Sequence, residues 1–277
     1  MKTTALFFSA THKTEKVALN IKKGIDESLS INGDEGNVIN IASREAQDEI
    51  YEFGEDDLVI VGSNTYAGRV PNKIAPIFKD NVKGNGAKAA VFVTYGNRAY
   101  DDSLKELAYL MKSNGFKVVA AAAFVAQHSF TDKVANNRPT EEDLMKAYNF
   151  GKEIVAKLSD KAGCEEIDID KLSGRAYEEM QYYKPLKEDG TPAVFLKAKP
   201  VTDKGLCDGC GICRKVCPMD CFKESLEEPS GVCIKCMACV ADCPQKAKKF
   251  TDEELSGHIK MLENNFAGAH REIEIFI

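Results

Sequence analysis

Eight of the ten cysteines in this 277-residue chain lie in two runs with the same spacing. The first run reads CDGCGICRKVCP over residues 207–218, and the second reads CIKCMACVADCP over residues 233–244. Each cysteine of the first run, and the proline that closes it, recurs 26 residues later. The chain therefore contains an internal duplication built around thiols. Such thiols can form disulfides, bind zinc or hold iron–sulfur clusters.

Disulfides are typical of small secreted domains that lack a sufficient hydrophobic core. This chain is 44% hydrophobic, which is enough for one or two cores, and its first residues contain only a four-residue apolar run. That run is too short for a secretion signal, and no later stretch resembles a membrane span. We therefore expect a protein of the reducing cytoplasm, where structural disulfides are rare.

The spacing within each run favours iron–sulfur clusters over zinc. Structural zinc sites usually combine two C-x2-C pairs into one tetrahedral set. Here each run places three thiols on one tight loop, which suits three corners of a cubane because each iron takes one protein ligand. The fourth thiol begins the next segment and points away from its own loop. A zinc-binding interaction module remains the alternative.

Residues 200–250 resemble a bacterial two-cluster ferredoxin, in which the fourth cysteine of each C-x2-C-x2-C-x3-C-P run binds the neighbouring cluster. The resemblance implies two [4Fe-4S] clusters. One would take Cys207, Cys210 and Cys213 with Cys243; the other would take Cys233, Cys236 and Cys239 with Cys217.

Two cysteines remain outside this scheme. The repeat pairs Cys221 with Ala247, so we interpret Cys221 as a small packing residue near a cluster. Cys164 lies in a polar stretch without a second ligand nearby, and we assign it no role.

The first 160 residues alternate short apolar runs with segments of helical spacing. Five runs, TTALFF, NVINI, DLVIVGS, KAAVFVTYG and KVVAAAAFVA, are strand candidates. This pattern predicts an α/β domain: a five-stranded parallel sheet with helices on both faces and right-handed crossovers. Ligands of such sheets bind beyond the carboxyl ends of the strands.

Four loops are expected at that edge: 9–14, 62–71, 94–100 and 126–130. The first, SATHKT, is rich in hydroxyl groups and opens a helix, whose N-terminal N–H groups favour a phosphate. It has neither the NTP-binding nor the dinucleotide-binding glycine pattern, and Ser and Thr are also ordinary helix caps. GSNTYAGRVP and TYGNRAY add tyrosine and glycine, which suit a planar ring.

Residues 1–160 resemble a flavodoxin-like domain, and the whole chain resembles the anaerobe proteins that fuse such a domain to a two-cluster ferredoxin. The resemblance implies FMN. His12 stands where flavodoxins usually have glycine, Lys13 is an unusual neighbour, and tryptophan is absent. The candidate FMN-binding residues are Ser9, Thr11, His12, Lys13, Thr14, Ser63, Asn64, Thr65, Tyr66, Ala67, Gly68, Arg69, Thr94, Tyr95, Gly96, Asn97, Tyr100 and His128.

Arg69 supports a sharper hypothesis. A cation near N1 or N5 of a flavin stabilises its anionic reduced states, which raises the reduction potential. The alternative is a solvent-facing arginine that neutralises an acidic surface.

The domain organisation expected from these patterns is a flavodoxin-like FMN-binding domain (1–160), a packed connector (161–199), a small α+β 2[4Fe-4S] ferredoxin domain (200–250) and a C-terminal extension (251–277). The net charge of −6 argues against binding to nucleic acid or to an anionic membrane, and without a long apolar stretch we expect no membrane insertion.

The chain shows no nucleophile–base constellation and no nicotinamide fingerprint, so we name no catalytic residue. We expect an electron-transfer protein that passes electrons between FMN and two low-potential clusters in an anaerobic cytoplasm, linking one- and two-electron carriers. Its expected partners are ferredoxin-type donors or acceptors, and a homodimer is conceivable. The alternative is an FMN-dependent reductase of a small molecule, fed by the clusters.

Overall fold

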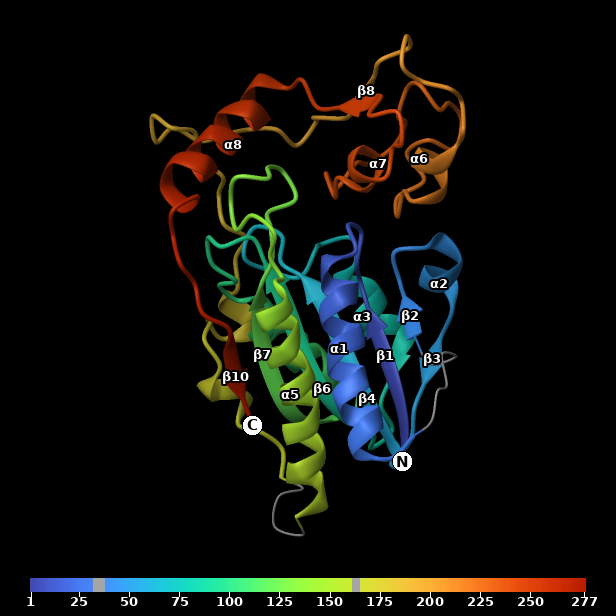
Figure 1. The fold of residues 1–277 in the computed structure, drawn as a ribbon, viewed down its shortest axis with the longest axis vertical. Coiled ribbons are helices and arrows are strands. Elements are labelled where there is room, and N and C mark those ends of the chain that lie inside the picture. The colour runs from blue at the N-terminus through green and yellow to red at the C-terminus, as the bar shows by residue number, and fades with distance from the viewer. Residues whose placement is uncertain (32–37, 161–164) are drawn as a thin grey trace.

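The structure of the chain, a computed structural model, describes residues 1–31, 38–160 and 165–277. Its centre is a sheet of six strands in the order β10-β7-β6-β4-β1-β2 (Figure 1). The strands are β1 (Lys2–Phe7), β2 (Val38–Asn40), β4 (Asp57–Asn64), β6 (Lys88–Tyr95), β7 (Lys117–Val125) and β10 (Glu274–Phe276).

The first five strands are parallel, and their order in the chain gives the spatial order 2-1-3-4-5 of the flavodoxin-like fold. This confirms the predicted fold class. The sixth strand, β10, pairs antiparallel with β7, with Ile275 opposite Ala122. The expectation of five strands was therefore one short, because the C-terminal residues extend the edge of the sheet.

Both faces of the sheet are buried, which explains the continuous apolar runs. In β6, Val91 and Val93 belong to the core on one face, whereas Ala90 and Phe92 belong to the core on the other. Helices α1 (Lys13–Ser28) and α5 (Glu141–Ser159) cover one face; α3 (Ala75–Asn81) and α4 (Ser103–Ser113) cover the other (Figure 1).

Helices α1 and α5 pack with their backbones close together. A Cβ atom added to Gly24 would lie 2.0 Å from the Tyr148 carbonyl oxygen, and one added to Gly151 would lie 2.2 Å from that of Ile21. Glycine at both positions therefore permits this approach. The packing fixes α1, whose N-terminus lies at the carboxyl edge of the sheet.

The chain leaves the sheet domain after α5 and returns to it at its end. Residues 165–199 include the short 3₁₀ helices η2 (Ile169–Lys171) and η3 (Tyr177–Glu179), and they pack on the sheet domain: Arg175 pairs with Asp102 at 2.8 Å, and the Tyr183 N–H donates to the Ala67 carbonyl. These bonds hold residues 165–199 against the sheet domain.

The two cysteine runs lie above the carboxyl ends of the parallel strands (Figure 1). This region contains β8 (Val201–Thr202), α6 (Ile212–Lys215), α7 (Ala238–Ala241) and β9 (Lys248–Lys249). Helix α8 (Glu253–Phe266) then crosses back, and the tail descends to β10. The remaining elements of the sheet domain are α2 (Arg44–Asp48) and the short strand pair β3 (Tyr51–Glu52) and β5 (Val82–Lys83).

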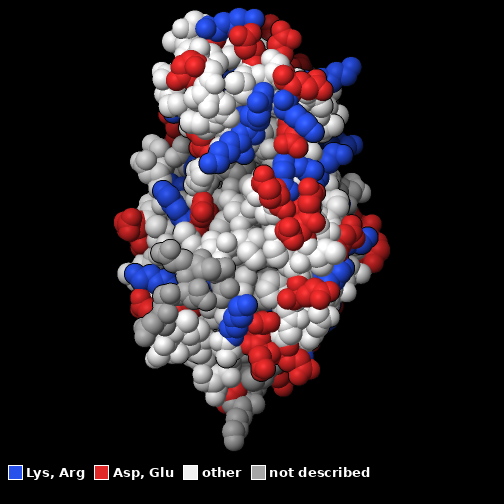
Figure 2. Space-filling model, turned by 90° about the vertical axis from the view of Figure 1, so that its right-hand side faces the viewer, with Lys and Arg blue, Asp and Glu red and all other residues white. Residues whose placement is uncertain are grey.

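Acidic and basic side chains are interspersed over the face drawn in Figure 2, so that face presents no field of a single sign. Over the described ranges, none of the helices is both long and apolar enough to span a bilayer. Cys164, to which the sequence gives no role, lies outside the described residues.

Candidate functional site

A cavity of about 640 Å³ lies at the carboxyl edge of the sheet, which is the position expected for a ligand of this fold. Its size falls within the range of roughly 300–1,000 Å³ typical of small-molecule and cofactor sites. Eleven of the predicted FMN residues line it: Thr11, Lys13, Thr14, Asn64, Thr65, Tyr66, Ala67, Thr94, Tyr95, Gly96 and His128.

One end of this cavity is formed by the start of α1. In the part of the chain that the structure describes, no group accepts a hydrogen bond from the backbone N–H groups of residues 10–14. His12 has a left-handed backbone with φ of 62°, which turns the chain so that this series of donors precedes the helix. Successive free N–H groups at a helix N-terminus fit a phosphate.

Hydroxyl groups brace this end. The Thr14 and Thr94 hydroxyls are hydrogen-bonded at 2.7 Å, which ties the first turn of α1 to the end of β6. The Ser9 hydroxyl accepts from the Glu15 N–H at 3.1 Å and so caps the helix. Ser9 does not line the cavity, and its observed role is to shape the loop.

The wall beside β4 carries an unpaired acceptor. The side-chain amide oxygen of Asn64 is buried and has no partner among the described residues, although Asn64 lines the cavity. An unpaired buried acceptor is unfavourable unless a ligand supplies a donor. The N–H of a flavin ring fits that requirement, and Tyr95 and Gly96 at the end of β6 line the same cavity.

Seven predicted residues are not brought to this cavity: Ser9, His12, Ser63, Gly68, Arg69, Asn97 and Tyr100. Of these, Ser63 is buried and donates to the Asn64 carbonyl. Gly68 has a φ of 79° in a tight turn, where an added Cβ would lie 2.2 Å from a carboxylate oxygen of Asp101.

Arg69 faces away from the cavity. Its guanidinium forms two hydrogen bonds to the Glu106 carboxylate, at 2.6 and 3.1 Å, and a third to the Met180 carbonyl at 3.1 Å. It also lies over the Tyr182 ring, 5.0 Å from its centroid. This arrangement gives Arg69 a clamping role between the loop, α4 and the connector, in place of the expected contact with a flavin.

Asn97 and Tyr100 hold the C-terminal tail. The Asn97 amide donates to the carbonyls of Phe266 and Ala269, and the Tyr100 hydroxyl donates to Glu274 of β10 at 2.8 Å. Both residues follow β6 as predicted, but the tail occupies their polar groups.

His12 joins the loop before α1 to the second cysteine run. Its ring nitrogens lie 3.0 Å from Glu15 and 3.2 Å from Asp242. The hydrogen bond to Glu15 raises the pKa of His12, burial opposes this increase, and Asp242 adds to it.

His128 lies in the cavity wall with its tautomer set by the backbone. Its Nδ1 atom accepts from the Phe130 N–H at 3.1 Å, so the ring proton of the neutral form is on Nε2. Burial, together with the nearby His258, lowers the pKa of His128 to about 4. The ring is therefore neutral at physiological pH.

The sequence did not indicate the segments that close the cavity. Tyr183 and Phe195 of the connector line it, as do Ile234 and Lys235 of the second cysteine run and His258 of α8. Phe195 stacks on His258 with ring centroids 5.4 Å apart. The connector and α8 carry no cofactor motif, and the cysteine run shows no pattern that points to this cavity.

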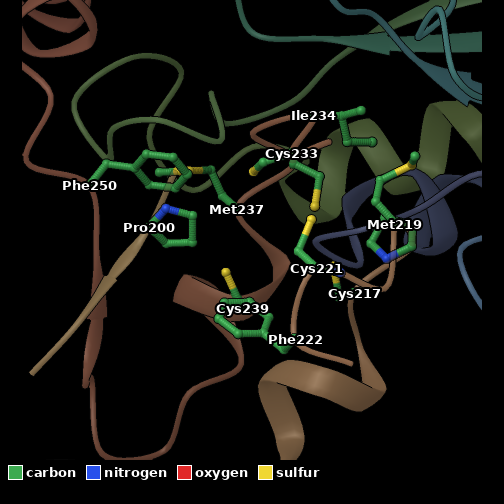
Figure 3. Close-up of a pocket in the computed structure, with 12 residues that line it drawn as sticks. Pro200, Cys217, Met219, Cys221, Phe222, Cys233, Ile234, Met237, Cys239 and Phe250 are labelled. Atoms are coloured by element: carbon green, nitrogen blue, oxygen red, sulfur yellow. The ribbon is translucent and has the colours of Figure 1, made fainter. Parts of the chain in front are cut away.

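A second, much smaller cavity of about 20 Å³ lies among the cysteines (Figure 3). Four of the thiols around it are Cys217, Cys233, Cys236 and Cys239, the set that the ferredoxin resemblance assigns to one cluster. Burial raises the pKa of Cys236 to about 12. Cys207, Cys210, Cys213 and Cys243 lie outside this cavity, and Cys210 is exposed.

The two cysteine runs share their backbone conformation as well as their spacing. Gly211 before α6 and Met237 before α7 both have a left-handed backbone, with φ of 79° and 66°. The N–H groups of Cys221 and Ala247 each donate to the thiol four residues earlier, at 3.3 Å in both cases. The duplication therefore extends to three dimensions.

Within the described ranges, no three His, Cys, Asp or Glu side chains converge on a position for a single metal ion. A cubane has a different requirement, since its four thiolates bind four separate irons. The four thiols that line the small cavity match a cubane in number and in donor type.

The repeat pairs Cys221 with Ala247, which gave no reason to expect a thiol at this position among the cluster cysteines, yet Cys221 lies beside them. It is buried, lines the same small cavity, and its thiol donates to the Val232 carbonyl at 3.2 Å. Figure 3 shows its sulfur directed towards Cys233. Its side chain is thus already hydrogen-bonded to the backbone.

The cysteine region is tied to the sheet domain by side chains near both runs. The Gln47 amide donates to the Pro218 carbonyl at 3.0 Å in a buried contact, and Arg44 pairs with Asp220 at 3.3 Å. With the His12–Asp242 contact, these bonds fix the cysteine runs over the loop that opens α1.

Comparison with known proteins agrees with this arrangement. Residues 200–223, which include the first cysteine run, match the 4Fe-4S binding domain. None of the curated proteins matches the chain.

Among solved structures, an archaeal flavodoxin aligns with 58% of this chain and 100% of its own, at 18% identity and a TM-score of 0.42. Flavodoxin 2 from Bacillus cereus aligns with 57% of this chain and 99% of its own, at 19% identity and a TM-score of 0.41. A flavodoxin from Streptococcus pneumoniae aligns with 57% and 99%, at 20% identity and a TM-score of 0.40. These similarities are too weak to decide the fold, which is established by the strand order. The chain thus joins a flavodoxin-like α/β domain to a 4Fe-4S binding segment.

Proposed function

We propose that this chain is an electron-transfer protein that binds FMN in the large cavity and two [4Fe-4S] clusters through its eight repeated cysteines. The observation that carries the proposal is the contact between the two cavities: Cys233 and Ile234 line both. Bound FMN would supply two-electron chemistry in single-electron steps, and the clusters would supply one-electron transfer.

The residues of the chain have distinct tasks in this proposal. The free N–H groups of residues 10–14, with Thr11 and Lys13, bind the phosphate. The loops after β4 and β6 hold the ring, and the connector and α8 exclude water from it. Residues 1–160 and 200–250 are the two cofactor-binding domains, and the rest of the chain joins and covers them.

The exposed Cys210 marks the side of the cysteine region where a redox partner would dock. The cluster set of Cys207, Cys210, Cys213 and Cys243 lies away from the large cavity, whereas Cys233 borders it. The partner we propose is a one-electron redox protein of the ferredoxin type.

Anaerobic purification followed by cofactor analysis tests the proposal. We expect a brown protein with one FMN per chain and about eight iron and eight sulfide per chain, as two cubanes require. A variant with Cys233 and Cys236 replaced by serine should retain about half of the iron. Colourless protein, or zinc without acid-labile sulfide, would contradict the proposal and favour a zinc module.

One feature favours a second candidate, reduction of a small molecule. The cavity extends to a wall of Phe130, Phe195, His128 and His258, where His128 presents a fixed Nε2–H donor. Stopped-flow mixing of the reduced holoprotein with quinones, nitro compounds and ferredoxin-type proteins separates the two functions. Fast, saturable oxidation by one small molecule would favour the reductase.

A further inference from the structure

The hydroxyl group of Tyr66 is buried and has no hydrogen-bond partner among the described residues. Tyr66 follows β4 in a tight turn, in which its N–H and carbonyl both bond to the backbone of Arg69, at 2.8 and 3.1 Å. The turn fixes the direction of the side chain. A buried donor without an acceptor is unfavourable, and such a group is often completed by a bound ligand.

The surroundings of this hydroxyl point to the ligand. Tyr66 packs against the buried core that includes Cys236, and it lines the large cavity together with Cys233. Both cysteines belong to the set of four that surrounds the small cavity, and Cys233 also lines the large one. Tyr66 itself lines the large cavity, whose wall shares Cys233 and Ile234 with the small cavity.

We propose that the Tyr66 hydroxyl donates a hydrogen bond to a sulfur of the cluster held by Cys217, Cys233, Cys236 and Cys239, and that this cluster, rather than its twin, exchanges electrons with the flavin. The inference rests on the function proposed above. It orders the route as redox partner, outer cluster, inner cluster and flavin.

Each electron-transfer step on this route would move one electron. Full reduction of a bound flavin would take two successive electrons from one-electron protein donors and two protons from water, which form N–H bonds on the ring and leave hydroxide. Oxidation would release the two protons and return the electrons, one at a time, to one-electron acceptors. The hydrogen bond favours the reduced inner cluster, whose sulfurs carry more negative charge. It therefore raises the reduction potential of that cluster relative to its twin.

The competing partner of the hydroxyl is Asn64. Its amide oxygen is also unpaired, and Asn64 lies close enough to Tyr66 to compete for its hydroxyl group. A small movement that joined them would satisfy both groups within the sheet domain. In that case the hydroxyl would have no effect on either cluster.

The test uses the anaerobic holoprotein with Tyr66→Phe and, as a matched control, Tyr95→Phe. Tyr95 lines the same cavity, but its hydroxyl bonds to the Glu272 carbonyl at 3.4 Å, away from the cysteines. Potentiometric titrations followed by electron paramagnetic resonance give the potential of each cluster. We expect Tyr66→Phe to shift one cluster to a more negative potential, and Tyr95→Phe to shift neither.

Two further measurements separate a hydrogen bond from a general structural effect. Electron–nuclear double resonance of the reduced protein, in H₂O and D₂O, should show one exchangeable proton coupled to a cluster. The signal of this proton should be missing in Tyr66→Phe. The spin relaxation of the flavin radical should accelerate as the Tyr66-sensitive cluster becomes reduced.

The outcomes are distinct. Protein without flavin or clusters contradicts the proposed function itself. With both cofactors present in normal amounts, equal or absent shifts in Tyr66→Phe overturn the hydrogen bond. Radical relaxation that follows the other cluster overturns the electron route.

Discussion

Arg69→Ala should lower the free energy of unfolding strongly and leave the flavin reduction potential unchanged. The side chain of Glu106 is only 3% exposed, and its carboxylate accepts two hydrogen bonds from Arg69 and one from the Val70 N–H at 2.9 Å. Without Arg69, a buried carboxylate keeps a single backbone partner. Breaking a buried ion pair in this way costs about 3–5 kcal/mol.

Urea unfolding followed by circular dichroism measures this loss, with Lys23→Ala as the control. The Lys23–Glu27 pair is exposed and 3.9 Å long, so its loss should cost about 0.2–1 kcal/mol. A double-mutant cycle of Arg69→Ala and Glu106→Ala should show a coupling of about 2 kcal/mol or more. Additive single effects, or a loss below about 1 kcal/mol for Arg69→Ala, would refute the clamp. If Arg69→Ala instead lowered the reduction potential of the flavin and left the free energy of unfolding unchanged, the expected position of the Arg69 cation beside the flavin ring would be supported.

Three further predictions concern the cysteine region and the tail. Cys221→Ala should keep about eight iron per chain, because the repeat gives this thiol no cluster; loss of half of the iron on analysis would contradict this. Glu15 and then Asp242 raise the pKa of His12 above 6.5, so the ion pairs of His12 stabilise the fold below that pH and are lost as pH rises through the raised pKa. The urea concentration at the unfolding midpoint should therefore fall with rising pH more steeply in the wild-type protein than in His12→Asn. Asparagine is the chosen replacement because it tolerates the left-handed backbone at this position. Equal slopes would exclude this role. Tyr100→Phe removes a hydrogen bond to the Glu274 carboxylate of β10 and should lower the free energy of unfolding in urea by about 1.5–3 kcal/mol. FMN binding should stay unchanged. A weaker affinity for FMN would indicate a contact that the structure does not show.

The sheet could be predicted from the sequence because its strands are buried on both faces. Such strands appear as unbroken apolar runs, as in KAAVFVTYG. The last strand was harder to place. REIEIFI alternates as a strand does, but its antiparallel pairing with β7 depends on a chain path that no local pattern records.

The cavity was predictable where a motif determines the backbone. SATHKT lies at a helix start, the loop after β4 brings Tyr66 to the cavity, and Tyr95 reaches it as the last residue of β6. Side-chain direction was not predictable. Arg69 turned to Glu106, 37 residues away, and Asn97 turned to carbonyls near the end of the chain. Contacts between residues so far apart in the sequence leave no signal in the spacing of residue types.

The cysteine region begins and ends in segments anchored to one sheet. The connector is bonded to loops of the sheet domain, and the tail after α8 becomes its edge strand. The region therefore behaves as an insertion with two tethers, and a protease cut in either tether would leave the other in place. Its distance from the large cavity is set by folding and does not depend on a swinging arm. Under the proposed function, the rate of electron transfer between the two cofactor sites should therefore be insensitive to solvent viscosity.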